Sequence, residues 1–154
     1  NHHYINMQEW QHQLFIKEVS NSKEVYLLQN NQWFITCESN LEWDNTVDPP
    51  SVLCFWSNKT LAKVCQKNHW NDAEIITVPL SEFIESWCVG IENDGHIIGT
   101  NFNQNLFWRE IQWYDLILEL INHLEVTKEN LQLHKYKNLG DFKKNVESVI
   151  SKDI

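Results

Sequence analysis

Residues 52–67, VLCFWSNKTLAKVCQK, carry the pattern that most constrains the fold. The first five residues are an unbroken apolar run, which is typical of a short buried strand. From Lys59 onward, apolar residues recur at helical spacing, with Ser57 in front of them as a candidate N-cap. The stretch therefore predicts a buried strand at 52–56 that leads directly into a helix at 59–67. The apolar face of that helix consists of Leu61, Ala62, Val64 and Cys65.

The N-terminal part of the chain predicts a helix, a hairpin and a loop. Residues 4–19 have apolar residues at helical spacing with polar residues between them. Two β-rich runs, 24–29 and 32–38, flank Asn30-Asn31, a pair that favours a tight turn. The acidic stretch 39–51 ends in a double proline, which excludes a helix or a central strand, so we expect a surface loop. The apolar positions of the first helix are Trp10, Leu14, Phe15 and Val19.

The pattern continues with alternating strands and helices up to residue 125. In chain order, the predicted elements are a strand at 74–78, a helix from its N-cap Ser81 to about Ile91, a hairpin of strands at 96–100 and 105–108, and a core helix at 110–125. Within the hairpin, Gly99 permits a bulge or close packing. The apolar face of the core helix consists of Ile111, Tyr114, Leu118, Ile121 and Leu124.

The composition changes beyond Val126. Residues 1–127 hold 17 acidic and 6 basic residues, whereas residues 128–154 hold 4 acidic and 6 basic residues. The tail predicts one further helix at about 141–150, after a break at Gly140. We therefore expect a single α+β domain, in which a mainly antiparallel sheet of five or six strands is packed by three or four helices over 1–127, with a C-terminal helical extension over 128–154.

The net charge of −11 over residues 1–127 indicates the kind of partner. A compact acidic domain attracts basic partners and repels nucleic acid and anionic membranes. The N-terminus lacks the pattern of a signal peptide, and no apolar stretch approaches the length of a membrane span. These features predict a cytoplasmic protein that binds a basic protein and neither nucleic acid nor membrane.

No motif indicates catalysis or a cofactor. The seven histidines are scattered without the spacing of a metal site. A nucleophilic pair of Cys65 or Cys88 with His69 or His96 stays open, because such partners need only meet in space. We expect a non-enzymatic protein that uses no metal and no cofactor.

The four cysteines, Cys37, Cys54, Cys65 and Cys88, form no CxxC pair and lie in contexts typical of buried positions. We interpret them as reduced core thiols. A disulfide is the alternative, since an even number of cysteines permits one if the protein is secreted.

The segment 38–48, ESNLEWDNTVD, holds four acidic residues and a tryptophan without a basic residue. Interfaces concentrate binding energy in a few aromatic residues ringed by polar groups, and an acidic rim accelerates encounter with a cationic partner. The alternative, which does not exclude the first, is that the apolar residues of this segment cover the sheet. Carboxylate pairs such as Glu82/Glu85 and Glu92/Asp94 are more typical of solvated surface than of acid–base chemistry. The candidate partner interface consists of Glu38, Glu42, Trp43, Asp44, Asp48, Glu92 and Asp94.

Three segments resemble, in this order, a bacterial family of small uncharacterised proteins: FWSNKTLAKVC at 55–65, ITVPLSEF at 76–83 and NDGHIIGTN at 93–101. In that family a W-S-x-x-x-x-A helix start, an I-x-L-x-E-F helix entry and a D-G-x-x-V-G strand recur, and Ile98 here replaces the valine. The resemblance covers about residues 13–124, its motifs are structural, and it offers no catalytic residues. The tail beyond Val126 has no counterpart in it.

Such small acidic proteins are similar to immunity proteins encoded beside polymorphic or contact-dependent toxins. The resemblance therefore implies that this chain binds a cognate basic toxin domain, such as a ribonuclease or another nuclease, and occludes its active site. A regulatory or scaffold binding module and a small Cys–His hydrolase are the alternatives.

Overall fold

The computed structural model describes residues 2–40 and 48–152, with side chains from Met7 onward. Helices and strands alternate along it, which confirms the predicted α+β class. The segment from α3 to α4 is one continuous helical stretch with a π-helical turn, η1, at its centre. The elements are α1 (His2–Ser22), β1 (Glu24–Gln29), β2 (Thr36–Glu38), β3 (Ser51–Phe55), α2 (Lys59–His69), β4 (Glu74–Pro79), α3 (Leu80–Glu82), η1 (Phe83–Trp87), α4 (Cys88–Asn93), β5 (Ile97–Thr100), β6 (Arg109–Ile111), α5 (Trp113–Val126) and α6 (Leu139–Lys152).

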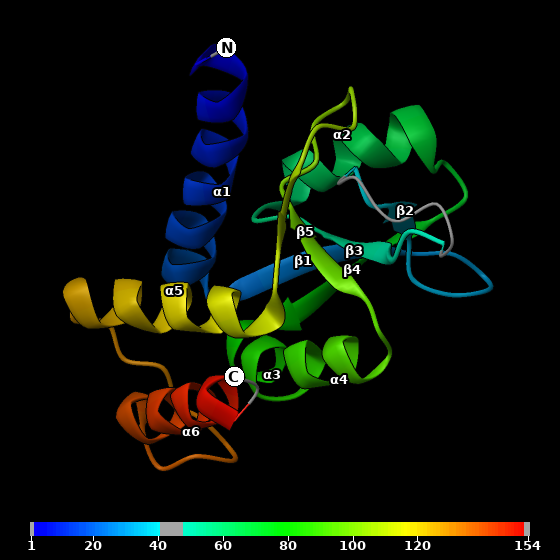
Figure 1. The fold of residues 1–154 in the computed structure, drawn as a ribbon. Coiled ribbons are helices and arrows are strands. Elements are labelled where there is room, and N and C mark those ends of the chain that lie inside the picture. Colours follow the sequence, from blue (N-terminus) through cyan, green and yellow to red (C-terminus); the bar gives the residue numbers. More distant parts are fainter. Residues whose placement is uncertain (1, 41–47, 153–154) are drawn as a thin grey trace.

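The strands of the described part form two sheets (Figure 1). β1 and β4 pair antiparallel. The second sheet has the order β2-β3-β5-β6, in which β3 and β5 run parallel and the other neighbours antiparallel. Tyr26 and Trp56 join the two sheets, because their backbones exchange hydrogen bonds of 2.9 and 2.8 Å. The mainly antiparallel arrangement is thus confirmed, with its strands divided between two sheets.

Alternation of side chains along β3 creates a core on each face of the sheet. Leu53 and Phe55 belong to a larger core that includes buried residues of α1, α5 and the α3–α4 segment. Cys54 and the following Trp56 belong to a smaller core, where they are joined by Cys65 of α2. Figure 1 shows the same division, with α2 on one side of the strands and α3, α4 and α5 on the other. The buried strand and the helix that follows it are therefore confirmed.

Gly99 of β5 sits where no larger residue fits. A Cβ atom at this position would lie 2.6 Å from the ring of Phe102 and 2.7 Å from Cγ1 of Val52. The Phe102 ring itself stacks on Trp108, with 4.6 Å between ring centroids. The close packing predicted at Gly99 is confirmed.

The C-terminal tail is attached to the rest of the molecule by apolar and polar contacts. Phe142 of α6 is buried in the larger core. The buried carboxylate of Glu85 accepts the backbone N–H groups of His134 and Lys135 at 2.7–3.0 Å. The prediction that Glu85 is solvated surface is therefore wrong, because the tail covers it and donates to it. Gly140 lies in the first turn of α6. The predicted break at Gly140, ahead of the helix, is therefore wrong.

The first predicted hairpin is correct only at its turn and for the residues next to it. Asn30 forms that turn, since its Oδ1 accepts the N–H groups of Gln32 and Trp33 at 2.9 Å. Beyond the turn, the hairpin continues for a short distance, through an isolated bridge between Gln29 and Phe34 and a hydrogen bond of 2.9 Å from the Ile35 N–H to the Leu28 carbonyl oxygen. β1 instead pairs with β4, and β2 pairs with β3. An isolated hairpin cannot bury both faces of β1, whereas the long-range pairing places them against both cores.

The second hairpin and the core helix are confirmed with shifted boundaries. β5 pairs antiparallel with β6, which starts at Arg109, later than predicted. Asn103 closes the longer connection, because its Oδ1 accepts the N–H groups of Asn105 and Phe107 at 2.9 and 3.0 Å. Since the strand occupies the residues up to Ile111, α5 begins only after it.

Two predicted helix caps are wrong. Asn58 caps α2 in place of Ser57, because the Asn58 Oδ1 accepts the N–H of Leu61 at 2.8 Å. Ser81 lies inside the helical segment, whose N-cap position is held by Pro79 without a side-chain hydrogen bond.

The N-terminal helix is confirmed, but its buried face is rotated relative to the prediction. Trp10 is 65% exposed, while Phe15 and Val19 are fully buried. The polar His12 is also fully buried and takes part in the inward face. In the described part of the chain, no helix has both the length and the apolarity needed to cross a membrane.

Candidate functional site

A hollow of about 310 Å³ lies where the turn after β1, the α3–α4 segment and the residue before β5 meet. Its lining is mostly apolar and rich in rings. A mostly apolar hollow with a few polar groups is the usual form of a binding pocket, and this volume is at the small end of the range for ligand sites. We call it the aromatic pocket, and it is lined by Trp33, Phe34, Leu53, Ser86, Trp87, Gly90, Ile91, Asp94 and His96.

Local backbone structure places the rings of this pocket. Trp33 follows the turn that ends β1, and Trp87 is the last residue of the π-helical turn η1. Gly95, with a φ of +77°, reverses the chain after α4, a conformation that glycine adopts without strain. The N–H of His96 then donates to the carbonyl oxygen of Ile91 at 3.0 Å, which holds the imidazole beside the helix end.

The rings contact one another and form a wall of the pocket. The ring centroids of Trp33 and His96 are 5.0 Å apart, and those of Phe34 and Trp87 are also 5.0 Å apart. Trp33 contacts Phe34 at 5.6 Å and is nevertheless 42% exposed. A large indole that is fixed by neighbouring rings and still open to solvent is the kind of side chain that anchors interfaces.

Two polar side chains complete the pocket. Asp94 is exposed and lies at the C-cap of α4. Nδ1 of His96 is buried and has no hydrogen-bond partner among the described residues. The lining contains no lysine and no arginine.

A second hollow adjoins the aromatic pocket, and a third adjoins the second. The second, of about 360 Å³, shares His96 with the pocket, and the third, of about 210 Å³, shares Ile97 and Gln112 with the second. We call the three hollows together the His96 face. The second hollow is lined by Asp48, Pro50, Glu92, Gly95, His96, Ile97 and Gln112, and the third by Ile97, Arg109, Glu110, Ile111, Gln112 and Asp115.

The His96 face is strongly acidic. Among the described residues, its charged lining includes Asp48, Glu92, Asp94, Glu110, Asp115 and one base, Arg109. The guanidinium of Arg109 already pairs with Glu9 at 3.1 Å. Partial burial and the nearby Glu119 raise the pKa of Asp115, while Arg109 opposes them. Converging carboxylates in concave surfaces focus a negative potential, which attracts cationic groups.

The structure brings together three of the residues predicted as an interface. Asp48 and Glu92 line the second hollow, and Asp94 lines the aromatic pocket beside it. Glu38 lies at the end of β2, opposite Ser51, and does not line these hollows. The other predicted interface residues, Glu42, Trp43 and Asp44, lie outside the described residues.

The aromatic residues of the pocket were not predicted as site residues. Trp33 and Trp87 come from segments far apart in the sequence, and their local patterns indicated only a strand and a helix. His96 was considered solely as a partner for a cysteine. The one available signal was the pair Trp33-Phe34 directly after a strong turn, since two consecutive large aromatics cannot both be buried on one face of a strand.

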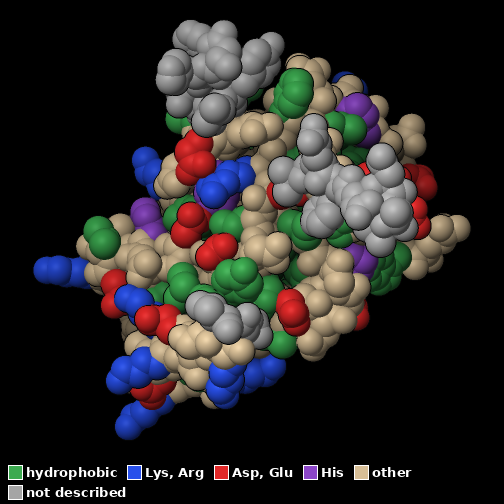
Figure 2. All heavy atoms as spheres, in the orientation of Figure 1, with side chains coloured by type: hydrophobic (Ala, Val, Ile, Leu, Met, Phe, Trp, Pro, Cys, Tyr) green, Lys and Arg blue, Asp and Glu red, His purple; other side chains and the backbone are tan. Residues whose placement is uncertain are grey.

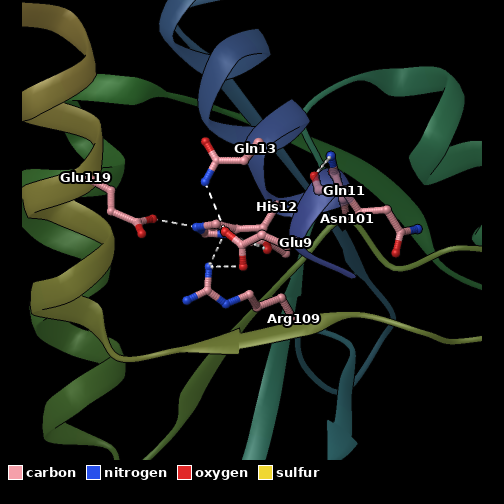
Figure 3. Close-up of polar contacts among 8 residues, drawn as sticks. Glu9, Gln11, His12, Gln13, Asn101, Arg109 and Glu119 are labelled. Carbon is pink, nitrogen blue, oxygen red and sulfur yellow. Dashed lines mark hydrogen bonds and ion pairs between the residues drawn. The ribbon is translucent and has the colours of Figure 1, made fainter. Parts of the chain in front are cut away.

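A second histidine cluster lies between α1, β5 and α5 (Figure 3). His12 Nδ1 is 2.9 Å from Oγ1 of Thr100, and its Nε2 is 2.5 Å from a carboxylate oxygen of Glu119. A hydroxyl, an imidazole and a carboxylate in this order resemble a nucleophile with its base and orienting acid. However, His12 and Thr100 are both fully buried, so no substrate reaches the hydroxyl. The cluster therefore joins α1, β5 and α5.

Further polar and charged side chains next to the His12 cluster connect α1 to the β5–β6 hairpin. Figure 3 shows Arg109 of β6 reaching Glu9 of α1, with Gln13 on the same side of the helix. The Gln13 amide donates to Glu9 at 3.0 Å. Asn101, which follows β5, donates to the backbone oxygen of Gln11 at 3.1 Å and so fixes α1 from the other side. These contacts hold α1 against the β5–β6 hairpin.

The cysteines are free thiols, as predicted. Cys54 donates to Cys37 over 4.0 Å, a contact that lowers the pKa of the half-buried Cys37 thiol, while its partial burial opposes the change. Burial raises the pKa of Cys65 to about 11 and also raises the pKa of Cys88.

The cysteine–histidine pairs that the sequence left open as an alternative are absent from the contacts of the described residues. Cys65 donates to the carbonyl oxygen of Phe102 at 3.2 Å. Nε2 of His69 lies 2.6 Å from the carbonyl oxygen of Gln104. Across residues 2–40 and 48–152, no three His, Cys, Asp or Glu side chains are placed so that they could hold a metal ion.

Comparison with known proteins assigns the chain to a family. No curated protein matches it. Residues 12–120 match the family model described as "Protein of unknown function (DUF2750)". The matched range begins at the buried His12 and ends within α5, and it contains every residue that lines the aromatic pocket. The chain therefore belongs to the DUF2750 family.

Proposed function

We propose that this protein is a non-enzymatic inhibitor that binds a basic protein domain, as the immunity partner of a bacterial toxin nuclease. The observation that carries the proposal is the His96 face, where an aromatic pocket that holds a half-exposed tryptophan and Asp94 lies beside hollows whose described lining includes four carboxylates and one paired arginine. Interface energy concentrates in such aromatic anchors, and acidic surroundings accelerate the approach of a cationic partner.

The distribution of charge over the surface supports a directional approach. Figure 2 shows several basic side chains at the lower left, with some acidic ones among them, and a group of acidic side chains with one basic group over the middle of the same view. The sequence has the same asymmetry, since residues 128–154 hold 6 of the 12 lysines and arginines. A basic partner is therefore steered away from the tail and toward the acidic part of the molecule.

Occlusion is the mechanism that this surface suggests. A nuclease presents cationic groups to the phosphates of its substrate. Carboxylates such as Asp94, Glu92 and Asp48 would pair with those groups, while Trp33 enters a gap between them. The inhibitor then occupies the substrate site without any chemical step.

The test is inhibition at a fixed stoichiometry. The purified chain is mixed with the C-terminal domain of the protein that the neighbouring gene encodes, the candidate toxin, and nuclease activity is followed during titration. We expect activity to disappear at one equivalent. Absence of a complex together with full nuclease activity would overturn the proposal, and a complex that leaves the nuclease active would favour the regulatory or scaffold alternative.

A pair of charge reversals tests the surface. Asp94→Lys removes a carboxylate from the pocket, whereas Glu147→Lys makes the same change on the exposed side of α6. We expect Asp94→Lys to slow association by about tenfold and Glu147→Lys to leave the rate nearly unchanged, because steering depends on charges near the contact. Equal rates for the two variants would show that the partner does not approach through the His96 face.

A further inference from the structure

We propose that the aromatic pocket binds a guanidinium group, supplied by an arginine side chain of the partner. This inference rests on the proposed function for the origin of the arginine, but the recognition of the guanidinium is a property of the pocket and is tested separately. It names the chemical group that enters the pocket and the residues that select it.

The rings of the pocket favour a cation over a neutral apolar group. Trp33 and Trp87 are tryptophans, and the face of an indole attracts cations more strongly than that of any other aromatic side chain. The Phe34 ring contacts both of them, with its centroid 5.6 Å from that of Trp33 and 5.0 Å from that of Trp87. The imidazole of His96, 5.0 Å from Trp33, extends this wall. Guanidinium is planar and weakly hydrated, so it stacks on aromatic rings at a lower desolvation cost than ammonium.

The charges of the pocket point to the same ligand. Asp94 is the one Asp, Glu, Lys or Arg among the described residues of the lining, and Glu92 and Asp48 line the hollow that adjoins it across His96. Carboxylates accept two parallel N–H groups from a guanidinium, a geometry that a single ammonium cannot supply. An anionic ligand would face repulsion from Asp94, because the described lining holds no lysine or arginine to compensate for it.

The size and the apolar floor of the pocket fit one side chain. A volume of about 310 Å³ is at the small end of the range for ligand sites and is sufficient for one side chain. Leu53 and Ile91 lie on the apolar side of the lining, where they would contact the methylene stem of an arginine. Long basic side chains bury such stems while the charged head reaches polar groups.

The test uses a small probe, so it does not depend on the identity of the partner. The full-length protein, labelled with ¹⁵N at its tryptophan indoles, is titrated with n-butylguanidinium and with its neutral counterpart n-butylurea. We expect saturable shifts of the Trp33 and Trp87 signals with n-butylguanidinium, and affinity roughly five- to thirtyfold lower for n-butylurea. The exposed Trp10 indole on α1 serves as the internal control and should not shift.

Two variants identify the residues responsible. Asp94→Asn keeps the shape of the side chain and removes its charge, and we expect it to reduce n-butylguanidinium affinity by about fivefold or more. Glu147→Gln removes a charge from α6 and should change nothing. Equal binding of the urea and the guanidinium, tighter binding of n-butylammonium, or the absence of any shift at Trp33 and Trp87 would each overturn the inference.

The outcomes separate this inference from the proposed function. Selective guanidinium binding without inhibition of the toxin domain would leave the pocket assignment standing and contradict the immunity role. Inhibition of the toxin domain without guanidinium binding would do the reverse.

Discussion

The two histidine clusters of this protein have opposite surroundings. His12 is fully buried, and both of its nitrogens have partners, Thr100 and Glu119. His96 is partly exposed, lines two hollows and has a buried Nδ1 without a partner among the described residues. The His12 cluster has the arrangement of a catalytic triad, but its histidine and hydroxyl are closed to solvent. The His96 face is open to solvent, but its described residues do not form such a triad.

The difference separates what stabilises the fold from what remains to bind a partner. Buried polar groups must be satisfied internally, and once satisfied they fix how elements pack. At the His12 cluster this requirement joins α1, β5 and α5. At the His96 face, by contrast, aromatic area and negative charge are left uncovered, as at interfaces.

Removing the two histidines should have unequal effects on stability. His12→Ala leaves a cavity and strands the buried Thr100 hydroxyl, so we expect a loss of about 3 kcal/mol in the free energy of unfolding. His96→Ala should cost less than about 1 kcal/mol, because its side chain is partly exposed and one nitrogen has no partner in the described part of the chain. Urea denaturation of both variants measures the difference, and equal losses would break the comparison.

Two glycine-to-alanine variants extend the comparison to the backbone. Gly99→Ala forces a Cβ within 2.6 Å of the Phe102 ring, and we expect it to destabilise the protein by about 2 kcal/mol. Gly90 lies in α4 and lines the aromatic pocket, and a Cβ added there would meet no described atom within 4 Å. Gly90→Ala should therefore stabilise the protein by about 0.5–1 kcal/mol. Thermal unfolding of the pair measures both signs, and a destabilised Gly90→Ala variant would contradict the open pocket.

The Cys37 and Cys65 thiols should be alkylated at different rates, a comparison that does not depend on the free energy of unfolding. A hydrogen bond from Cys54 lowers the pKa of Cys37, whereas burial raises the pKa of Cys65 to about 11. Because the thiolate is the reactive form, Cys37 should be alkylated first, and its rate should rise with pH at lower values than for an ordinary cysteine. Peptide mass mapping after iodoacetamide treatment at several pH values identifies the order. Faster reaction at Cys65 would be the contrary result.

Local sequence patterns predicted the elements better than their partners. The strand at 52–56, the following helix and the core helix all depend on periodicity within one segment, and each is present. Strand pairing depends on distant segments, so the hairpin predicted after Asn30 gave way to pairing of β1 with β4. The predicted N-cap of α2 is wrong because two adjacent residues can both cap a helix. Asn58 caps α2 in place of the predicted Ser57.

The sequence predicts the acidic residues of the candidate site but not its aromatic pocket. The surplus of acidic residues indicated Asp48, Glu92 and Asp94, and the structure places them in adjoining hollows. The aromatic pocket was missed because it is assembled from the turn after β1, the π-helical turn and the residue before β5. No single segment carries that combination, since Trp33 and Trp87 become neighbours of the same ring only in the folded chain.

The most direct test of the central claim is the affinity of two tryptophan variants for the basic toxin domain, measured by calorimetry. Trp33 and Trp10 are both exposed, but only Trp33 lines the aromatic pocket. We expect Trp33→Ala to weaken binding by about 2 kcal/mol, or roughly thirtyfold, as at an interface hot spot, and Trp10→Ala to leave the affinity within about twofold of the unmodified protein. Equal affinities for the two variants, or a larger loss with Trp10→Ala, would contradict the assignment of the His96 face as the binding surface.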